Sequence, residues 1–309
     1  MDTTIAIVIP ATCIALGLSL WGRINQRKSA LACLLCVAAF QLPARADEQK
    51  EEFLQLLSQY QAARKIVAES PEGDREARSN AREAAHALLP KLLDVWMALP
   101  DGSEERPTIG ELIKAICRDM ASPPRTEREN DEKSFIARTV WPLLADEKVT
   151  QEQAAFLAEL SKPQFSIRMN DRIARLGMGT EPLGWDVQAA YALALVRSGN
   201  PKQARDEITI LHKKVSRSHK VRPEDRSFTD ALQLCEVLHA LQAAVSKDHE
   251  GAMKHIENAR KLQDAISPKV APLVKEVTRR VLEAERDAKE QAPEKAEGFS
   301  ELPKKSLED

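Results

Sequence analysis

WDVQAAYALALVRSGNPKQARDEITILHKKV, residues 185–215, carries the clearest structural signal in this chain of 309 residues. Gly199 divides it into two halves, and apolar residues recur at helical spacing in both: Tyr191, Leu195, Ile208 and Leu211. Asn200 and Pro201 mark the start of the second half, because Asn caps helices and Pro is tolerated at the first helical position. The stretch therefore predicts a helical hairpin with its turn at Gly199.

Helical periodicity also runs through most of the chain from Asp47 onward. It predicts one helix that stops near residues 70–71 and a second over 74–99. Capping-box patterns predict three further helix starts, Thr108-x-x-Glu111, Thr126-x-x-Glu129 and Thr150-x-x-Gln153, and Asn200-x-x-Gln203 supports the start already named. Ser267-Pro268 predicts another start, and Pro90 and Pro142 fall inside proposed helices. Aromatic residues make up only 4% and no alternating run of strand length occurs, so we expect an all-α fold of about ten helices.

A second copy of the hairpin pattern lies in residues 230–264. It has His239-Ala240 where the first has Tyr191-Ala192, Ala252 and Ile256 where the first has Ala204 and Ile208, and Lys247 at the turn. Small residues at these positions resemble those of the tetratricopeptide repeat (TPR), whose two helices cross closely. The resemblance is limited to residues 185–264. Ser216 and Asp264 stand where the family has Pro, and the copies are 48 residues apart against a family period of about 34.

The TPR resemblance implies an α-solenoid of helical hairpins, with a capping helix over residues 268–286. It also implies recognition of a protein or peptide partner on the concave face. The candidate partner-binding residues are Gln188, Tyr191, Leu195, Glu236 and His239. The alternative is a generic helical array in which these side chains serve ordinary interhelical packing.

The N-terminus carries two apolar runs. Residues 4–21 contain no charge, a basic stretch follows, and residues 30–42 form a second run that ends in Pro43-Ala44-Arg45-Ala46. A basic region, a short apolar run and an Ala-x-Ala site are typical of a secretory signal peptide, with cleavage expected after Ala46. In a second interpretation the first run, at 18 residues, is a retained membrane anchor. A third is a buried core helix. The first two place residue 47 onward outside the cytoplasm, in the periplasm or the medium.

These patterns divide the chain into five parts. Residues 1–46 are the signal peptide or anchor, 47–165 an N-terminal helical region, 166–184 a loop or hinge, 185–287 the TPR-like hairpins with their capping helix, and 288–309 a disordered charged tail. Behind the leader remain Cys117 and Cys235, either as separate buried thiols or as a disulfide.

One basic segment stands out. Residues 212–222 read HKKVSRSHKVR and are predicted to form an interhelical connection. The candidate contacts to an anionic partner are Lys213, Lys214, Arg217, Lys220 and Arg222. The alternative is a loop charged only for solvation. The chain as a whole carries a formal net charge of -2 and the segment has no interleaved aromatic residue, so no nucleic-acid partner is expected.

Motifs for catalysis are absent from the sequence. There is no Gly-x-Gly-x-x-Gly, Walker loop, Gly-x-Ser-x-Gly or His-Glu-x-x-His. His249-Glu250 with His255 is the nearest metal-like cluster, but residues six apart on a helix diverge. We therefore expect no catalytic, cofactor or metal site, and a non-catalytic interaction scaffold of the cell envelope. One alternative is an envelope enzyme, hydrolase-like, with a buried acidic residue of raised pKa in a helical cleft. Another is a purely structural spacer.

Overall fold

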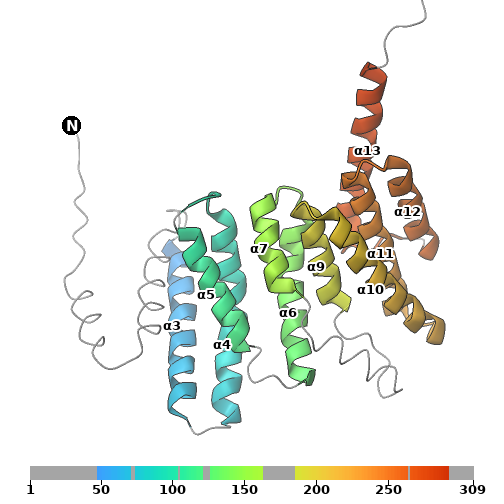
Figure 1. Ribbon diagram of the computed structural model, residues 1–309. Helices are drawn as coiled ribbons and strands as arrows, with labels where there is room; N and C mark the ends of the chain where they lie inside the picture. Colours follow the sequence, from blue (N-terminus) through green and yellow to red (C-terminus); the bar gives the residue numbers. More distant parts are fainter. Residues whose placement is uncertain are drawn as a thin grey trace, which may run out of the picture. The chain divides into compact units, whose positions relative to one another are not determined.

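The computed structural model (Figure 1) describes residues 47–70, 74–103, 105–120, 126–162, 185–263 and 265–291. Within these residues the chain forms ten α-helices and no β-strand, which confirms the all-α prediction. The leader at 1–46 and the hinge at 166–184 lie outside the described residues, as does the tail beyond Gln291. No helix in the described part has the length and apolar character needed to cross a membrane.

The chain divides into two compact units, and the boundary falls between Thr139 and Val140, inside helix α6 (Thr126–Ala145). The first unit contains α3 (Asp47–Glu69), α4 (Arg75–Ala98), α5 (Glu105–Met120) and the start of α6. Helix α4 packs against both α3 and α5. Its buried face carries Leu88, Leu92 and Trp96. Asp74 caps this helix by accepting the N–H groups of Glu76 and Ala77 at 3.0 and 3.1 Å.

The second unit contains α7 (Gln151–Ser161), α9 (Trp185–Arg197), α10 (Pro201–Val221), α11 (Arg226–Val245), α12 (His249–Leu262) and α13 (Ala271–Gln291). Helices α9 and α10 pack as one hairpin and α11 and α12 as a second, while α11 also contacts α9, α10 and α13. Alanines at the predicted small positions are fully buried: Ala192, Ala204, Ala240 and Ala252. Small side chains therefore lie in the packed interior of these hairpins.

The two hairpins turn in the same way. At the end of α9 the N–H of Asn200 donates to the carbonyl of Leu195 at 2.9 Å, and at the end of α11 the N–H of Asp248 donates to that of Ala243 at 2.9 Å. Between them Gly199 has a φ of 80° and Lys247 a φ of 64°. Both are the left-handed residue of a helix C-terminal motif. Lys247 thus occupies the position that the sequence aligns with Gly199.

The capping predictions have different outcomes. The box at Thr150 is confirmed: the Gln153 N–H donates to Thr150 Oγ1 at 3.2 Å, and the Thr150 N–H donates to Gln153 Oε1 at 2.9 Å. Helix α6 begins at Thr126, as predicted. The box at Thr108 is wrong, because α5 begins earlier, at Glu105.

Of the other two predicted helix starts, the one at Asn200-Pro201 is confirmed and the one at Ser267-Pro268 is not. Asn200 is the N-cap residue of α10, with Pro201 first in the helix, but its side chain makes no capping hydrogen bond. Its Nδ2 donates back to the carbonyl of Ser198 at 3.3 Å instead. Ser267-Pro268 precedes a turn rather than the helix itself, so α13 begins at Ala271. Helix α13 also runs to Gln291, and residues 288–291 are therefore helical rather than part of the predicted disordered tail.

A buried ion pair fastens α13 to α9. Arg197 Nη1 and Nη2 donate to the two carboxylate oxygens of Glu276 at 2.6 and 2.5 Å. The side chains are only 6% and 3% exposed. Arg197 Nε also donates to the carbonyl of Leu144 at 3.2 Å, and Arg280 Nε donates to Glu276 at 2.9 Å. Such a bidentate arrangement fixes both distance and orientation between the helices.

Candidate functional site

The five predicted partner-binding residues lie within the two hairpins. Gln188, Tyr191 and Leu195 on α9 and Glu236 on α11 are less than a tenth exposed, and His239 on α11 is half-buried. Leu195 packs in the core, and Tyr191 accepts a hydrogen bond from Gln203 Nε2 at 3.0 Å. These side chains therefore fill the space between helices, as in the packing alternative, and offer little surface to a partner.

Two of these residues make equivalent contacts in the two hairpins. Gln188 Nε2 donates to a carboxylate oxygen of Glu207 at 3.1 Å and to its carbonyl at 3.2 Å. At the positions 48 residues further along, Glu236 Oε2 lies 2.7 Å from His255 Nδ1. Each pair joins the first helix of its hairpin to the second. The 48-residue register therefore extends to a polar contact that the sequence comparison did not include.

Three histidines gather around Glu236, one from each of α10, α11 and α12. The His239 ring stacks on that of His255, with centroids 5.0 Å apart, and lies 5.9 Å from the ring of His212. The Glu236 carboxylate also lies 3.7 Å from His212 Nε2 and accepts from Asn258 Nδ2 at 3.4 Å. We call His212, Glu236, His239 and His255 the histidine cluster.

Burial and charge set the protonation of this cluster. Desolvation, together with the charges of His255, His212 and Arg205, lowers the pKa of His239 to about 4, and Glu236 opposes this shift. Desolvation raises the pKa of Glu236, but hydrogen bonds from His255 and Asn258 and the histidine charges outweigh it, so that pKa lies below its ordinary value. At neutral pH the cluster therefore holds a neutral His239 beside an ionised Glu236.

A metal site finds no support in the described part of the chain. No group of three or more His, Cys, Asp or Glu side chains there is arranged to hold a metal ion. The planes of the His239 and His255 rings are within 19° of parallel, so the rings face each other rather than a common ion. His255, which the sequence set beside His249 and Glu250, turns instead to Glu236.

The prediction that residues 212–222 form an interhelical connection is wrong. This basic segment is the C-terminal half of α10, followed by its cap residue. Leu211 and Val215 are fully buried, and α10 packs against both α9 and α11. Continuing the helix through Val221 therefore keeps an apolar stripe on the hairpins. The interhelical connection is short, since α11 begins at Arg226.

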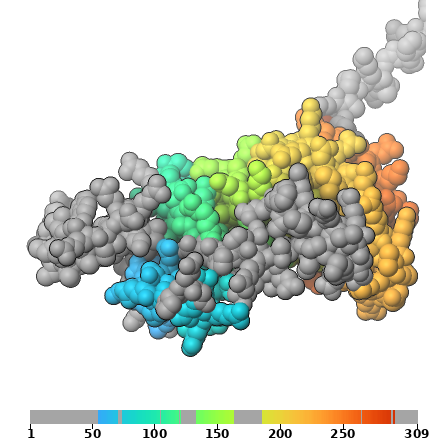
Figure 2. Space-filling view, turned by 60° about the horizontal axis from the view of Figure 1, so that its bottom comes forward, coloured from blue at the N-terminus to red at the C-terminus, as the bar shows by residue number. Residues whose placement is uncertain are grey.

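The candidate anionic-partner residues accordingly lie on a helix. Lys213, Arg217 and Lys220 are exposed and follow one another at helical spacing, while Lys214 and the cap residue Arg222 are half-buried. Helix α10 contributes to the yellow and gold surface of this unit in Figure 2. Spacing of three and four residues places the three exposed cations on one solvent-facing stripe.

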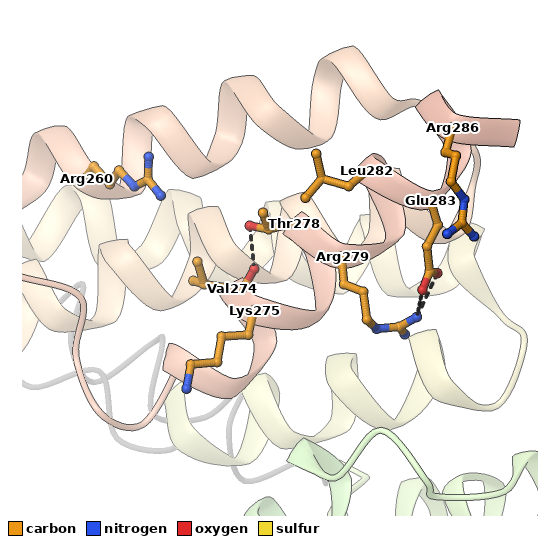
Figure 3. A pocket seen from close by; sticks show the side chains of 8 residues that line it. All are labelled: Arg260, Val274, Lys275, Thr278, Arg279, Leu282, Glu283 and Arg286. Atoms are coloured by element: carbon orange, nitrogen blue, oxygen red, sulfur yellow. Dashed lines mark hydrogen bonds and ion pairs between the residues drawn. The ribbon is translucent and has the colours of Figure 1, made fainter. Parts of the chain in front are cut away.

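An open pocket of about 600 Å³ lies at α12 and α13 (Figure 3). Arg260 comes from α12, and the other lining residues come from α13: Val274, Lys275, Thr278, Arg279, Leu282, Glu283 and Arg286. We call this the α12–α13 pocket. All its lining residues except Arg260 lie in the part that the sequence predicted only as a capping helix.

The sequence did not predict this pocket, nor the roles of His212 and His255. A partial signal existed, because Glu236 and His239 are three residues apart and so share one helix face. Which residues of α10 and α12 meet that face depends on where the helices cross. Periodicity within a single helix does not determine this crossing.

No family model, curated protein or solved structure matches the chain. The resemblance to the TPR remains a prediction from residues 185–264. The functional argument rests on the geometry of the second unit.

Proposed function

We propose that this protein is a non-catalytic interaction scaffold of the cell envelope, in which the hairpins α9–α10 and α11–α12 form a TPR-like α-solenoid that binds a partner protein. One observation carries the proposal: a 48-residue register relates the buried alanines, the left-handed turn residues and the polar pairs of the two hairpins. Helical-repeat proteins build extended binding surfaces by stacking such units.

The capping role expected for the last helix supports the same proposal. A short stack of repeats needs a helix that covers its exposed end. Helix α13 packs on α11 and α12, and the Arg197–Glu276 ion pair holds it to α9. A scaffold held in this way presents its partner with a surface of fixed geometry, which lowers the ordering cost of binding.

The location proposed for this scaffold is outside the cytoplasm, with attachment to the membrane if the leader is retained. The leader pattern at residues 1–46 motivates this part of the proposal. N-terminal sequencing of the mature protein distinguishes the two interpretations: a start at Asp47 indicates cleavage, and a start at Met1 contradicts it.

The enzyme alternative has less support from the described residues. It requires a buried carboxyl group with a raised pKa, as a general acid would have. The pKa of Glu236 is lowered, and Glu276 is engaged in its ion pair with Arg197. Desolvation does raise the pKa of Asp94, but this side chain is exposed on α4.

Site-specific photo-crosslinking in the native envelope tests the scaffold proposal. A photoreactive phenylalanine analogue replaces Leu282 or Ile210, two exposed apolar residues of the second unit, and Ile66 of the first unit serves as the matched control. We expect a discrete protein adduct from the second unit and none from Ile66. If neither Leu282 nor Ile210 gives an adduct, the scaffold proposal is refuted.

A further inference from the structure

The α12–α13 pocket contains apolar surface that is open to solvent. Leu282 is 59% exposed, a large fraction for a leucine in a folded protein. Val274 also lines the pocket. The Thr278 hydroxyl already donates to the carbonyl of Val274 at 2.9 Å, so this residue contributes chiefly its methyl group (Figure 3). The pocket could therefore bury an apolar side chain.

Positive charge surrounds this apolar surface. The lining has four cations and one carboxylate: Arg260, Lys275, Arg279, Arg286 and Glu283. Arg279 is already neutralised, since its Nη1 donates to Glu283 at 2.5 and 2.7 Å and its Nη2 pairs with Glu147. Neither Arg260 nor Lys275 has an ion-pair partner in the described part of the chain. The pocket is thus locally positive in a chain whose net charge is -2.

We propose that the α12–α13 pocket binds an acidic peptide segment of the partner protein, with one apolar side chain of the segment beside Leu282 and carboxylates on Arg260 and Lys275. The inference rests on the proposed scaffold function and names the site and the chemistry of its partner. A volume of about 600 Å³ is within the range of roughly 300–1,000 Å³ that ligand pockets occupy. Opposite charges at the rim would steer and orient the segment.

An acidic peptide fits this pocket better than a membrane or a nucleic acid does. Helices that lie on membranes present a continuous apolar face, often with Trp or Phe. The pocket lining has no aromatic residue and only one strongly exposed leucine. Single-stranded nucleic acids need aromatic platforms for stacking, which this lining also lacks.

Fluorescence polarisation of the mature protein tests the inference with a labelled peptide that alternates Glu with Leu. Two analogues serve as probe controls, one with Gln in place of Glu and one with Ser in place of Leu. The pocket variant is Arg260→Glu with Lys275→Glu, and the matched control reverses two exposed cations of α10 outside the candidate anionic-partner set, Lys202→Glu with Arg205→Glu. A Leu282→Ser variant tests the apolar contact separately.

We expect the pocket charge reversal and Leu282→Ser each to weaken binding of the Glu/Leu peptide by about tenfold or more. The α10 variant should bind this peptide within about twofold of the unaltered protein. Both analogue peptides should bind the unaltered protein more weakly than the Glu/Leu peptide does. Equal losses in the pocket and α10 variants would indicate a general charge effect and overturn the inference. So would binding to anionic phosphatidylserine vesicles in preference to the peptide, or no peptide binding at all. If the protein with an unaltered pocket fails to bind the peptide while the Ile210 crosslink still forms, the pocket inference fails and the scaffold function stands.

Discussion

Glu276→Gln is expected to destabilise the second unit by about 3–5 kcal/mol, the usual cost of removing one partner from a buried ion pair. The substitution keeps the side-chain volume, so no cavity contributes. It leaves the Arg197 guanidinium, whose side chain is 6% exposed, without the carboxylate that accepts its two short hydrogen bonds. Arg280 loses the same carboxylate, but it lies closer to water and adds less than about 1 kcal/mol.

Urea unfolding, monitored through hydrogen exchange in peptides from α9 and α13, measures this loss in the free energy of unfolding of the second unit. Glu283→Gln is the matched control, because Glu283 also pairs with an arginine but its side chain is 45% exposed; it should cost less than about 1 kcal/mol. A double variant, Arg197→Met with Glu276→Leu, should recover most of the loss by removing both charges. If Glu276→Gln costs no more than Glu283→Gln, the pair is not desolvated in solution and the reasoning is wrong.

Three further predictions follow from single residues. His239 has a pKa of about 4 in the folded protein, below its ordinary 6.5, so between these two pH values the unfolded chain binds more protons than the folded one. Stability is therefore lost as the pH falls from 6.5 towards 4. Allowing for its partial exposure, the loss between about pH 7 and about pH 5 should be about 1 kcal/mol in urea titrations, and His239→Gln should remove it. Gly199→Ala should lower stability by about 1 kcal/mol because Gly199 has a φ of 80°. Lys247→Gly should raise stability by about 0.5–1 kcal/mol because Lys247 has a φ of 64°. Changes of opposite sign in the thermal unfolding temperature would support the shared turn geometry. Burial raises the pKa of the Cys117 thiol to about 12 and also raises the pKa of Cys235, so neither should react with a thiol reagent in the native protein, and rapid labelling before unfolding would contradict their burial.

The sequence predicted the helices well because each depends on signals within a single segment. The hairpin at 185–215 was predicted from periodicity, the turn glycine and Pro201, and the box at Thr150 from a contact that spans only three residues. The basic segment was misjudged because its charges suggested a connection, although Leu211 and Val215 continue the apolar stripe. A high density of charge indicates that one side of a segment faces solvent, but it does not indicate that the helix has ended.

The sites were harder to predict because they depend on how separate helices cross. Glu236 and His239 could be placed on one face of a helix, but their contacts with His212 and His255 come from two other helices. The α12–α13 pocket depends in the same way on where Arg260 of α12 meets the face of α13. Neither arrangement follows from residue spacing along one segment.

The two hairpins place different polar side chains at equivalent positions between their helices. In the first, Gln188 and Glu207 pair an amide with one carboxylate. In the second, the equivalent residues are Glu236 and His255. His239, whose ring stacks on that of His255, stands at the position equivalent to Tyr191. The pKa of His239 lies at about 4, so acidification through that value adds a proton at this position of the second hairpin, whereas the Tyr191 phenol at the equivalent position of the first already holds its proton. Helix α12 carries both His255, which stacks on His239, and the pocket residue Arg260. The repeat thus supplies a common frame, and the residues that differ between its copies are the ones that can give the second hairpin a function of its own.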